Sequence, residues 1–158
     1  MVAELPAQVH ATCIARQIGG LWRAALLLGA SGAGKSDLAL RALNHGWRLV
    51  SDDYTCVWRS GEALYASAPR TIAGRIEARG LGILDLPRRD LAEVWVAANC
   101  ETTPLERLPE PETMQIAGLE LALVRLNALE SSALFKLDRA LSTRGQAQRL
   151  ERGRDGPI

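Results

Sequence analysis

The segment GASGAGKS at residues 29–36 matches the pattern G-x-x-x-x-G-K-[ST] at every fixed position. Its glycines allow backbone N–H groups to approach phosphate oxygens without a Cβ atom in the way. Lys35 can reach the outer phosphates as a point charge, and the Ser36 hydroxyl is a suitable ligand for Mg²⁺. A chance match in a chain of this length is expected in about one sequence in a hundred or fewer. The loop is therefore predicted to bind a phosphorylated nucleotide.

The sequence on either side of this loop supports the same prediction. LWRAALLL at residues 21–28 is typical of a buried strand, and an amphipathic pattern from Lys35 to Leu43 predicts a helix that ends near Asn44–Gly46. The N-terminus of that helix would point its dipole at the bound anion. The residues expected to contact the nucleotide are Gly29, Ser31, Gly32, Ala33, Gly34, Lys35, Ser36 and Asp37.

Two adjacent acids, Asp52 and Asp53, follow the apolar segment WRLV. They are expected at the carboxyl end of a strand, where ligands bind in open α/β sheets. Neighbouring side chains on an extended segment point to opposite sides, so one acid could accept a hydroxyl proton while the other faces a metal ion. The same residues would also suit a solvated strand end, and this local pattern leaves both interpretations open.

Two further acids are weaker candidates. Asp85, in GILDL, could be a Walker-B ligand for Mg²⁺, although Pro87 follows closely and the strand is short. Glu77 lies just before the glycines at 80 and 82, a position common for surface carboxylates.

The remaining pattern predicts an α/β domain that is richer in strand than in helix. Short apolar runs bounded by Gly, Pro and Ser predict strands at 9–18, 47–53, 82–86, 93–100 and 119–126, and a hairpin around Ser60–Gly61. The proline-rich segment 103–111 is expected to be an exposed loop, and Ser131–Ser132 could cap a last helix at 133–141. Residues 1–142 are expected to form one domain, and 143–158 a frayed or disordered tail.

Composition excludes several classes of protein. No apolar run is long enough for a transmembrane helix, and the N-terminal residues lack the pattern of a secretory signal. The net charge of +1 gives little support to nucleic-acid binding. The three scattered cysteines, Cys13, Cys56 and Cys100, lack metal-site spacing and are expected to be reduced, which favours a cytoplasmic protein.

Four segments together resemble the catalytic domain of HPr kinase/phosphorylase, a bacterial enzyme that acts on a serine of the phosphocarrier protein HPr. They are VHATC, GASGAGKSDLALRAL, GWRLVSDD and IEARGLGILDL. The resemblance covers residues 9–87 and continues weakly to about 141. It implies a P-loop-containing, strand-rich mixed sheet with few helices, similar to the HPr kinase and PEP carboxykinase-like catalytic core. The chain looks like a short form without the N-terminal domain of longer members.

The resemblance also implies roles for individual residues. Lys35 and Ser36 match the pair that binds phosphate and Mg²⁺. Asp52 matches the general base toward the acceptor serine, which acts as general acid when inorganic phosphate reverses the reaction. His10 matches an active-site histidine, although its position beside Val9 alone favours a partly buried strand residue.

The metal ligands implied by the resemblance are Ser36, Asp53 and Glu77, and the implied cofactors are ATP and Mg²⁺. Members of the family assemble as hexamers, so a homo-oligomer is expected. Long members carry an arginine-containing segment near the C-terminus; this chain lacks it, and Arg139 and Arg144 are the candidate substitutes.

Two alternatives stay open at the level of sequence. A small-molecule P-loop kinase would need an arginine-rich lid, whereas the arginines here are spread along the chain. A nucleotide-dependent regulatory module would bind partners without transferring phosphate. A GTPase is disfavoured because the sequence contains no NKxD tetrapeptide.

Overall fold

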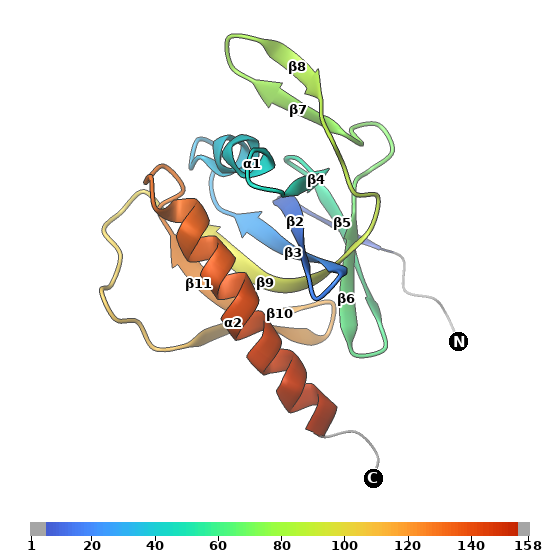
Figure 1. Ribbon diagram of the computed structural model, residues 1–158, viewed down its shortest axis with the longest axis vertical. Coiled ribbons are helices and arrows are strands. Elements are labelled where there is room, and N and C mark those ends of the chain that lie inside the picture. The colour runs from blue at the N-terminus through green and yellow to red at the C-terminus, as the bar shows by residue number, and fades with distance from the viewer. Residues whose placement is uncertain (1–5, 155–158) are drawn as a thin grey trace.

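The computed structural model describes residues 6–154, with side chains described as far as Thr143. This part of the chain contains eleven strands and two helices (Figure 1). The strands are β1 (Ala7–Val9), β2 (Thr12–Ile18), β3 (Leu21–Leu28), β4 (Arg48–Ser51), β5 (Thr55–Ser60), β6 (Ala63–Ser67), β7 (Arg75–Ala78), β8 (Gly82–Asp85), β9 (Ala92–Cys100), β10 (Glu112–Ile116) and β11 (Leu119–Leu126). The helices are α1 (Lys35–Leu43) and α2 (Ala133–Arg154). The structure is therefore a strand-rich mixed α/β fold, as predicted.

Nine of the strands form one mixed sheet, in which seven follow the order β1-β5-β6-β9-β3-β2-β4 and the other two, β10 and β11, lie off this path. Along one of its edges, strand β9 pairs with two different strands. Its first half pairs with β6 and its second half pairs with β11, which in turn pairs with β10. The two remaining strands, β7 and β8, form a separate antiparallel hairpin.

Strand direction brings several chain segments to one edge of this sheet. Strands β3, β9 and β11 are parallel, and β2 runs antiparallel to both β3 and β4, so β4 points the same way as β3. The carboxyl ends of β3, β4, β9 and β11 therefore meet at the same edge, together with the start of β2. This edge is where ligands bind in open α/β sheets.

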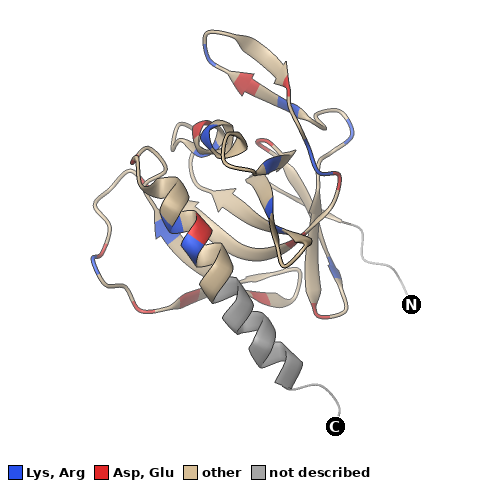
Figure 2. Cartoon of the chain, viewed as in Figure 1, with Lys and Arg blue, Asp and Glu red and all other residues tan. Residues whose placement is uncertain are grey.

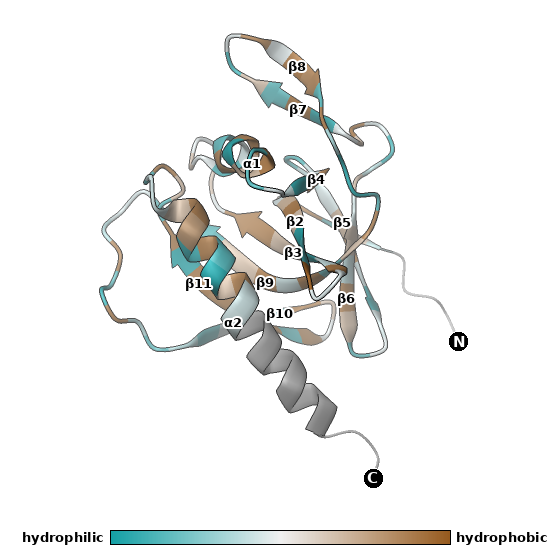
Figure 3. Ribbon diagram, in the orientation of Figure 1, coloured by the Kyte–Doolittle hydropathy of each residue, from teal (hydrophilic) through white to brown (hydrophobic). Residues whose placement is uncertain are grey.

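Apolar side chains cover both faces of the central strands. On β3, Ala25 and Leu27 belong to a cluster with α1 and α2, whereas Ala24 and Leu26 belong to a second cluster with β5, β6 and β11 on the opposite face. This arrangement explains why residues 24–28 form an almost continuous apolar run, which Figure 3 shows along β3. The central strands are thus fixed from both sides, and the loops at their ends rest on a rigid support.

Several elements differ from the sequence prediction. The segment 9–18, predicted as one strand, is two strands that separate at His10 and Ala11, because β1 pairs with β5 while β2 pairs with β3. Strands β7 and β10 were not predicted, since each is short and mixes charged with apolar residues. The loop at 103–111 is confirmed.

Helix α2 begins at Ala133 as predicted but continues to Arg154, well past the predicted end at 141. The residues that extend it include Arg, Gln, Ala and Leu, which favour helix without an apolar face. Residues 155–158 lie outside the described part, and the division into a domain at 1–142 and a tail at 143–158 stays a prediction.

The β7–β8 hairpin projects beyond α1 at one end of the molecule (Figure 1). Its Ile76 is buried against the core, whereas Leu81 and Ile83 are exposed. Figure 2 shows basic and acidic residues interspersed along the hairpin rather than gathered by sign. Among the described residues, neither helix combines the length and apolarity needed to cross a bilayer.

Candidate active site

The glycine-rich loop at 29–36 connects β3 to α1, and three of its glycines have a positive φ. Gly29, Gly32 and Gly34 have φ angles of 133°, 83° and 92°, in the region that favours glycine. A Cβ atom on Gly29 would lie 2.5 Å from the carbonyl oxygen of Cys100, and one on Gly34 would lie 2.7 Å from Leu129. Gly29 therefore needs glycine for space as well as for conformation, whereas the atom nearest to Gly34 belongs to the flexible side chain of Leu129.

The loop presents several backbone donors at its open side. Within the described part of the chain, Ala33 donates to the carbonyl of Ala30 at 3.1 Å, while the N–H groups of residues 31, 32 and 34–36 have no backbone acceptor. A Cβ atom on Gly32 would meet nothing within 4 Å, so a ligand could approach the backbone there. Free N–H groups before the first turn of a helix form a suitable cradle for an anion.

Lys35 is 7% exposed and lies beneath this loop. Its ammonium donates to the carbonyl of Gly29 and, at 3.4 Å, to that of Ala30. The ammonium therefore sits at the base of the loop, within reach of an anion bound there. Burial raises the pKa of the Cys100 thiol to about 11, and the positive charge of Lys35 opposes that shift.

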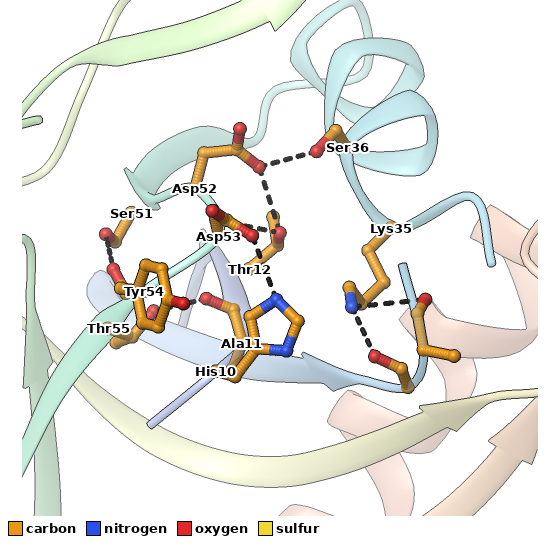
Figure 4. A network of polar contacts seen from close by, with 12 residues as sticks. His10, Ala11, Thr12, Lys35, Ser36, Ser51, Asp52, Asp53, Tyr54 and Thr55 are labelled. Atoms are coloured by element: carbon orange, nitrogen blue, oxygen red, sulfur yellow. Dashed lines mark hydrogen bonds and ion pairs between the residues drawn. The ribbon is translucent and has the colours of Figure 1, made fainter. Parts of the chain in front are cut away.

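Asp52 joins the loop to the central sheet. Its Oδ1 atom accepts hydrogen bonds from the Ser36 hydroxyl at 2.7 Å and from the Thr12 hydroxyl at 2.9 Å (Figure 4). Among the described residues, Oδ2 of the same carboxylate has no partner. One carboxylate oxygen is thus held by two hydroxyls, and the other remains able to accept a proton.

Asp53 is oriented differently, toward β1. Its Oδ1 atom lies 2.9 Å from Nε2 of His10, whose ring in turn packs against Tyr54 at 5.3 Å between centroids (Figure 4). Asp53 has a φ of 66°, unusual for a residue other than glycine, and the N–H of Tyr54 donates to the Asp52 carbonyl at 2.7 Å. This tight three-residue turn is a strained conformation that directs the two acids to opposite sides.

The structure therefore brings together five residues from distant segments of the chain: His10, Lys35, Ser36, Asp52 and Asp53. Each was singled out from the sequence. A sixth, Thr12, was not singled out, although it lies within the segment VHATC. Its hydroxyl contacts Asp52 and also accepts from the N–H of Asp53 at 3.3 Å. A threonine at the first position of a buried strand carries little signal in the sequence alone.

Other predicted residues lie outside this network. Glu77 is exposed on β7, between the buried Ile76 and Ala78, and Asp37 forms an ion pair with Arg41 on α1 at 3.0 Å. Among the described residues, no three acidic, histidine or cysteine side chains form a group that could hold a metal ion. Arg139 is exposed on α2, and the side chain of Arg144 lies outside the described part.

The Walker-B interpretation of Asp85 is wrong. A Walker-B strand is buried in the central sheet, whereas β8 pairs only with β7 in the projecting hairpin. The Asp85 side chain is 90% exposed and lies 3.7 Å from Arg75 on the opposite strand. The carboxylate beside the Ser36 hydroxyl comes instead from Asp52, after β4.

Fold and site together define a strand-rich α/β protein in which a glycine-rich strand–loop–helix unit faces a pair of acids. The sequence profile of the HPr Serine kinase C-terminal domain matches residues 6–89, more than half of the chain. The chain belongs to that family.

Curated relatives named HPr kinase/phosphorylase also match part of the chain. The protein from Chlorobium limicola is 36% identical over 115 residues, which cover 64% of this chain and 35% of that protein. The protein from Caldanaerobacter subterraneus subsp. tengcongensis is 52% identical over 62 residues, which cover 39% of this chain and 20% of that protein. The matched region thus spans about a third or less of these relatives.

A solved structure shares the fold over nearly its whole length. The HPr(Ser) kinase/phosphatase from Coxiella burnetii aligns with a TM-score of 0.67 at 23% sequence identity, covering 93% of this chain and 99% of that one. At this level of identity, the likeness establishes the fold.

Proposed function

We propose that this chain is an ATP-dependent protein serine kinase/phosphorylase that acts on the phosphocarrier protein HPr in the cytoplasm. The names of the curated relatives support the substrate. The free thiols of Cys13, Cys56 and Cys100 are in keeping with a reducing compartment.

The observation that carries this proposal is the hydrogen bond between Ser36 and Asp52. It joins the first turn of α1, where the terminal phosphates of ATP would lie, to a carboxylate with one unoccupied oxygen. An acceptor hydroxyl placed between that oxygen and the γ-phosphate would be in hydrogen-bonding reach of its base. A general base must meet this geometric condition before its acidity matters.

In the forward direction, the serine oxygen of HPr would attack the γ-phosphorus of ATP while Asp52 takes the hydroxyl proton. The new O–P bond forms as the bond to ADP breaks, and backbone N–H groups of the loop and Lys35 stabilise the charge on the transferring oxygens. His10, paired with Asp53, would flank the acceptor side of this centre.

In the reverse direction, inorganic phosphate would attack the phosphoserine phosphorus. Protonated Asp52 would then return its proton to the departing serine oxygen, and the products would be serine and pyrophosphate. The same carboxyl group serves both directions because it is a base when ionised and an acid when protonated.

The hydroxyl and carboxylate oxygens around Ser36 are suitable ligands for Mg²⁺. Magnesium takes few protein ligands and completes its shell with water and substrate phosphates, so the Ser36 hydroxyl and a neighbouring carboxylate would be sufficient. When bound, the ion would draw negative charge from the β- and γ-phosphate oxygens. Asp53 and Glu77 stay proposed ligands, and only Asp53 lies in the network around Asp52.

The proposal is tested by incubating the protein with ATP, Mg²⁺ and HPr and measuring serine phosphorylation by intact mass. Asp52→Asn should lower the rate about 10²- to 10⁴-fold, because the base is lost. Nucleotide affinity should change little, since an amide oxygen can still accept from Ser36 and Thr12. Asp85→Asn is the matched control, because this acid is exposed on the hairpin and should leave the rate unchanged.

Other outcomes would favour the alternatives. Binding of ATP and HPr without any phosphoserine would indicate a regulatory module. Phosphate transfer to a metabolite, in a panel screened with labelled ATP, would indicate a small-molecule kinase. Full activity of Asp52→Asn would remove this residue from the mechanism.

A further inference from the structure

Thr12 is the side chain that connects the two acids of the site. It is fully buried at the first position of β2, between β3 and β4 in the sheet. Its hydroxyl donates to Oδ1 of Asp52 at 2.9 Å and accepts from the N–H of Asp53 at 3.3 Å. Both contacts are drawn in Figure 4.

The two contacts use the hydroxyl group in complementary ways. A threonine hydroxyl has one proton and two lone pairs, so it can donate once while it accepts elsewhere. The proton is committed to Asp52, and a lone pair is committed to the backbone of Asp53. No apolar side chain of the same shape could make either contact.

The contact with Asp52 determines which carboxylate oxygen is available. Thr12 on β2 and Ser36 on α1 approach Oδ1 from two different elements and occupy it together. The carboxylate is thereby prevented from rotating, and Oδ2 remains the oxygen that can meet an acceptor hydroxyl. Such fixed orientation is what makes a base effective, because small misplacements of a reacting group cost about 10²-fold in rate.

The contact with Asp53 supports a strained turn. A positive φ at a residue other than glycine is unfavourable and persists only where its surroundings enforce it. By accepting the N–H of Asp53, Thr12 holds the turn in the form that directs its carboxylate toward His10. One buried hydroxyl thus orients both acids.

We infer that Thr12 is a positioning residue for the proposed phosphoryl transfer, holding Asp52 and Asp53 in their working orientations through a single hydroxyl. This inference rests on the proposed function. It predicts that removing the hydroxyl slows the chemical step and leaves nucleotide binding intact.

The test compares three variants in the HPr phosphorylation assay. Thr12→Val keeps the shape and removes the hydroxyl, and kcat should fall about 10- to 100-fold with the KM for ATP nearly unchanged. Thr12→Ser keeps the hydroxyl and should stay within about threefold of the wild-type kcat. Thr55→Val is the control: Thr55 is also fully buried, but its hydroxyl donates to the carbonyl of Ala11 at 2.8 Å and touches neither acid, so kcat should be unchanged.

A measurement independent of activity separates this inference from the proposed function. In a double-mutant cycle of Thr12→Val with Asp52→Ala, the shifts in the urea midpoint of unfolding should be non-additive, since both changes remove the same contact. If the wild-type protein is inactive but the midpoint shifts are non-additive, the proposed function is refuted, while the contact between Thr12 and Asp52 is upheld. If the wild-type protein is active, three results would each overturn the inference. The shifts in the urea midpoint could be additive, or the kcat of Thr12→Val could equal that of the wild type. The third such result is a kcat of Thr12→Ser as low as that of Thr12→Val.

Discussion

The glycines of the 29–36 loop share a positive φ, but their surroundings differ. Gly29 lies against the backbone of β9, whereas Gly32 faces open space on the side where an anion would bind. The first glycine is therefore required by the fold, and the second would be required by the proposed anion. Substitutions at the two positions should separate these requirements.

Alanine substitutions can distinguish the two glycines. Gly29→Ala should lower the free energy of unfolding by about 3 kcal/mol, because the added methyl group meets a carbonyl oxygen that cannot move away. Gly32→Ala should cost only about 1 kcal/mol but weaken nucleotide binding, since its methyl group would occupy the anion's approach. The measurements are urea unfolding and ATP titration.

Gly46→Ala is the matched control for this pair. Gly46 has a similar φ of 84° and open space around it, but it follows the end of α1 rather than the loop. It should match Gly32→Ala in stability and the wild type in ATP affinity. Equal affinities for Gly32→Ala and Gly46→Ala would contradict an anion site at the loop.

Single residues of the site could be predicted where they stand in a recognisable sequence pattern. Lys35, Ser36, Asp52 and Asp53 stand in recognisable local patterns, and the structure brings them together. Asp85 also stands in such a pattern, yet the sequence does not reveal that β8 leaves the central sheet. The sequence thus indicated which residues could bind a ligand or take part in catalysis, but it did not indicate which strands pair.

At the scale of elements, an ion-pair network joins β9, β10 and β11 near the edge of the sheet where the carboxyl ends of β9 and β11 lie. Arg125 on β11 contacts Glu101, just after β9, and Glu112 on β10 at 2.9 Å. Hydrogen bonds from Arg125 and then from Asn99 hold the pKa of Glu101 below its ordinary value. The folded protein therefore binds a proton at Glu101 less readily than the unfolded chain does.

This lowered pKa predicts a pH-dependent contribution to stability. The contribution is fully present above the ordinary pKa of 4.5 and is lost as the pH falls through the lowered pKa of the folded state. At pH 7, Glu101→Gln should therefore be less stable than the wild type. The difference between their urea midpoints should narrow as the pH falls from 5 to 3, and a constant or widening difference would contradict the assignment.

The order of the elements was largely predictable, because apolar runs and the glycines that bound them clearly mark β3, α1, β9 and β11. The length of α2 was not, since its second half has helix-forming residues but no apolar stripe to reveal a helix. The break between β1 and β2 was missed for a different reason. It arises from long-range pairing with two different strands, which no local pattern records.

At the scale of the whole molecule, a charged pair is buried at the end of the central strands that lies away from the loop. Arg23 on β3 contacts Glu93 on its parallel neighbour β9, and its guanidinium lies 4.5 Å from the ring centroid of Trp95. Their side chains are only 8% and 13% exposed. Arg23 precedes the end of β3 by five residues, about 17 Å along the strand, so this pair can affect stability without touching the site.

Glu93→Gln should consequently destabilise the protein without impairing its chemistry. The change removes the carboxylate charge that pairs with the buried guanidinium of Arg23, and the free energy of unfolding should fall by about 3 kcal/mol. Glu62→Gln, which affects an exposed ion pair with Arg59, should cost less than about 1 kcal/mol. Urea unfolding measures both, and ATP affinity well below the unfolding transition should equal that of the wild type. If Glu93→Gln lowers the free energy of unfolding no more than Glu62→Gln does, solvent screens the pair of Arg23 and Glu93. If the folded Glu93→Gln variant binds ATP more weakly than the wild type, the far end of the sheet is coupled to the loop.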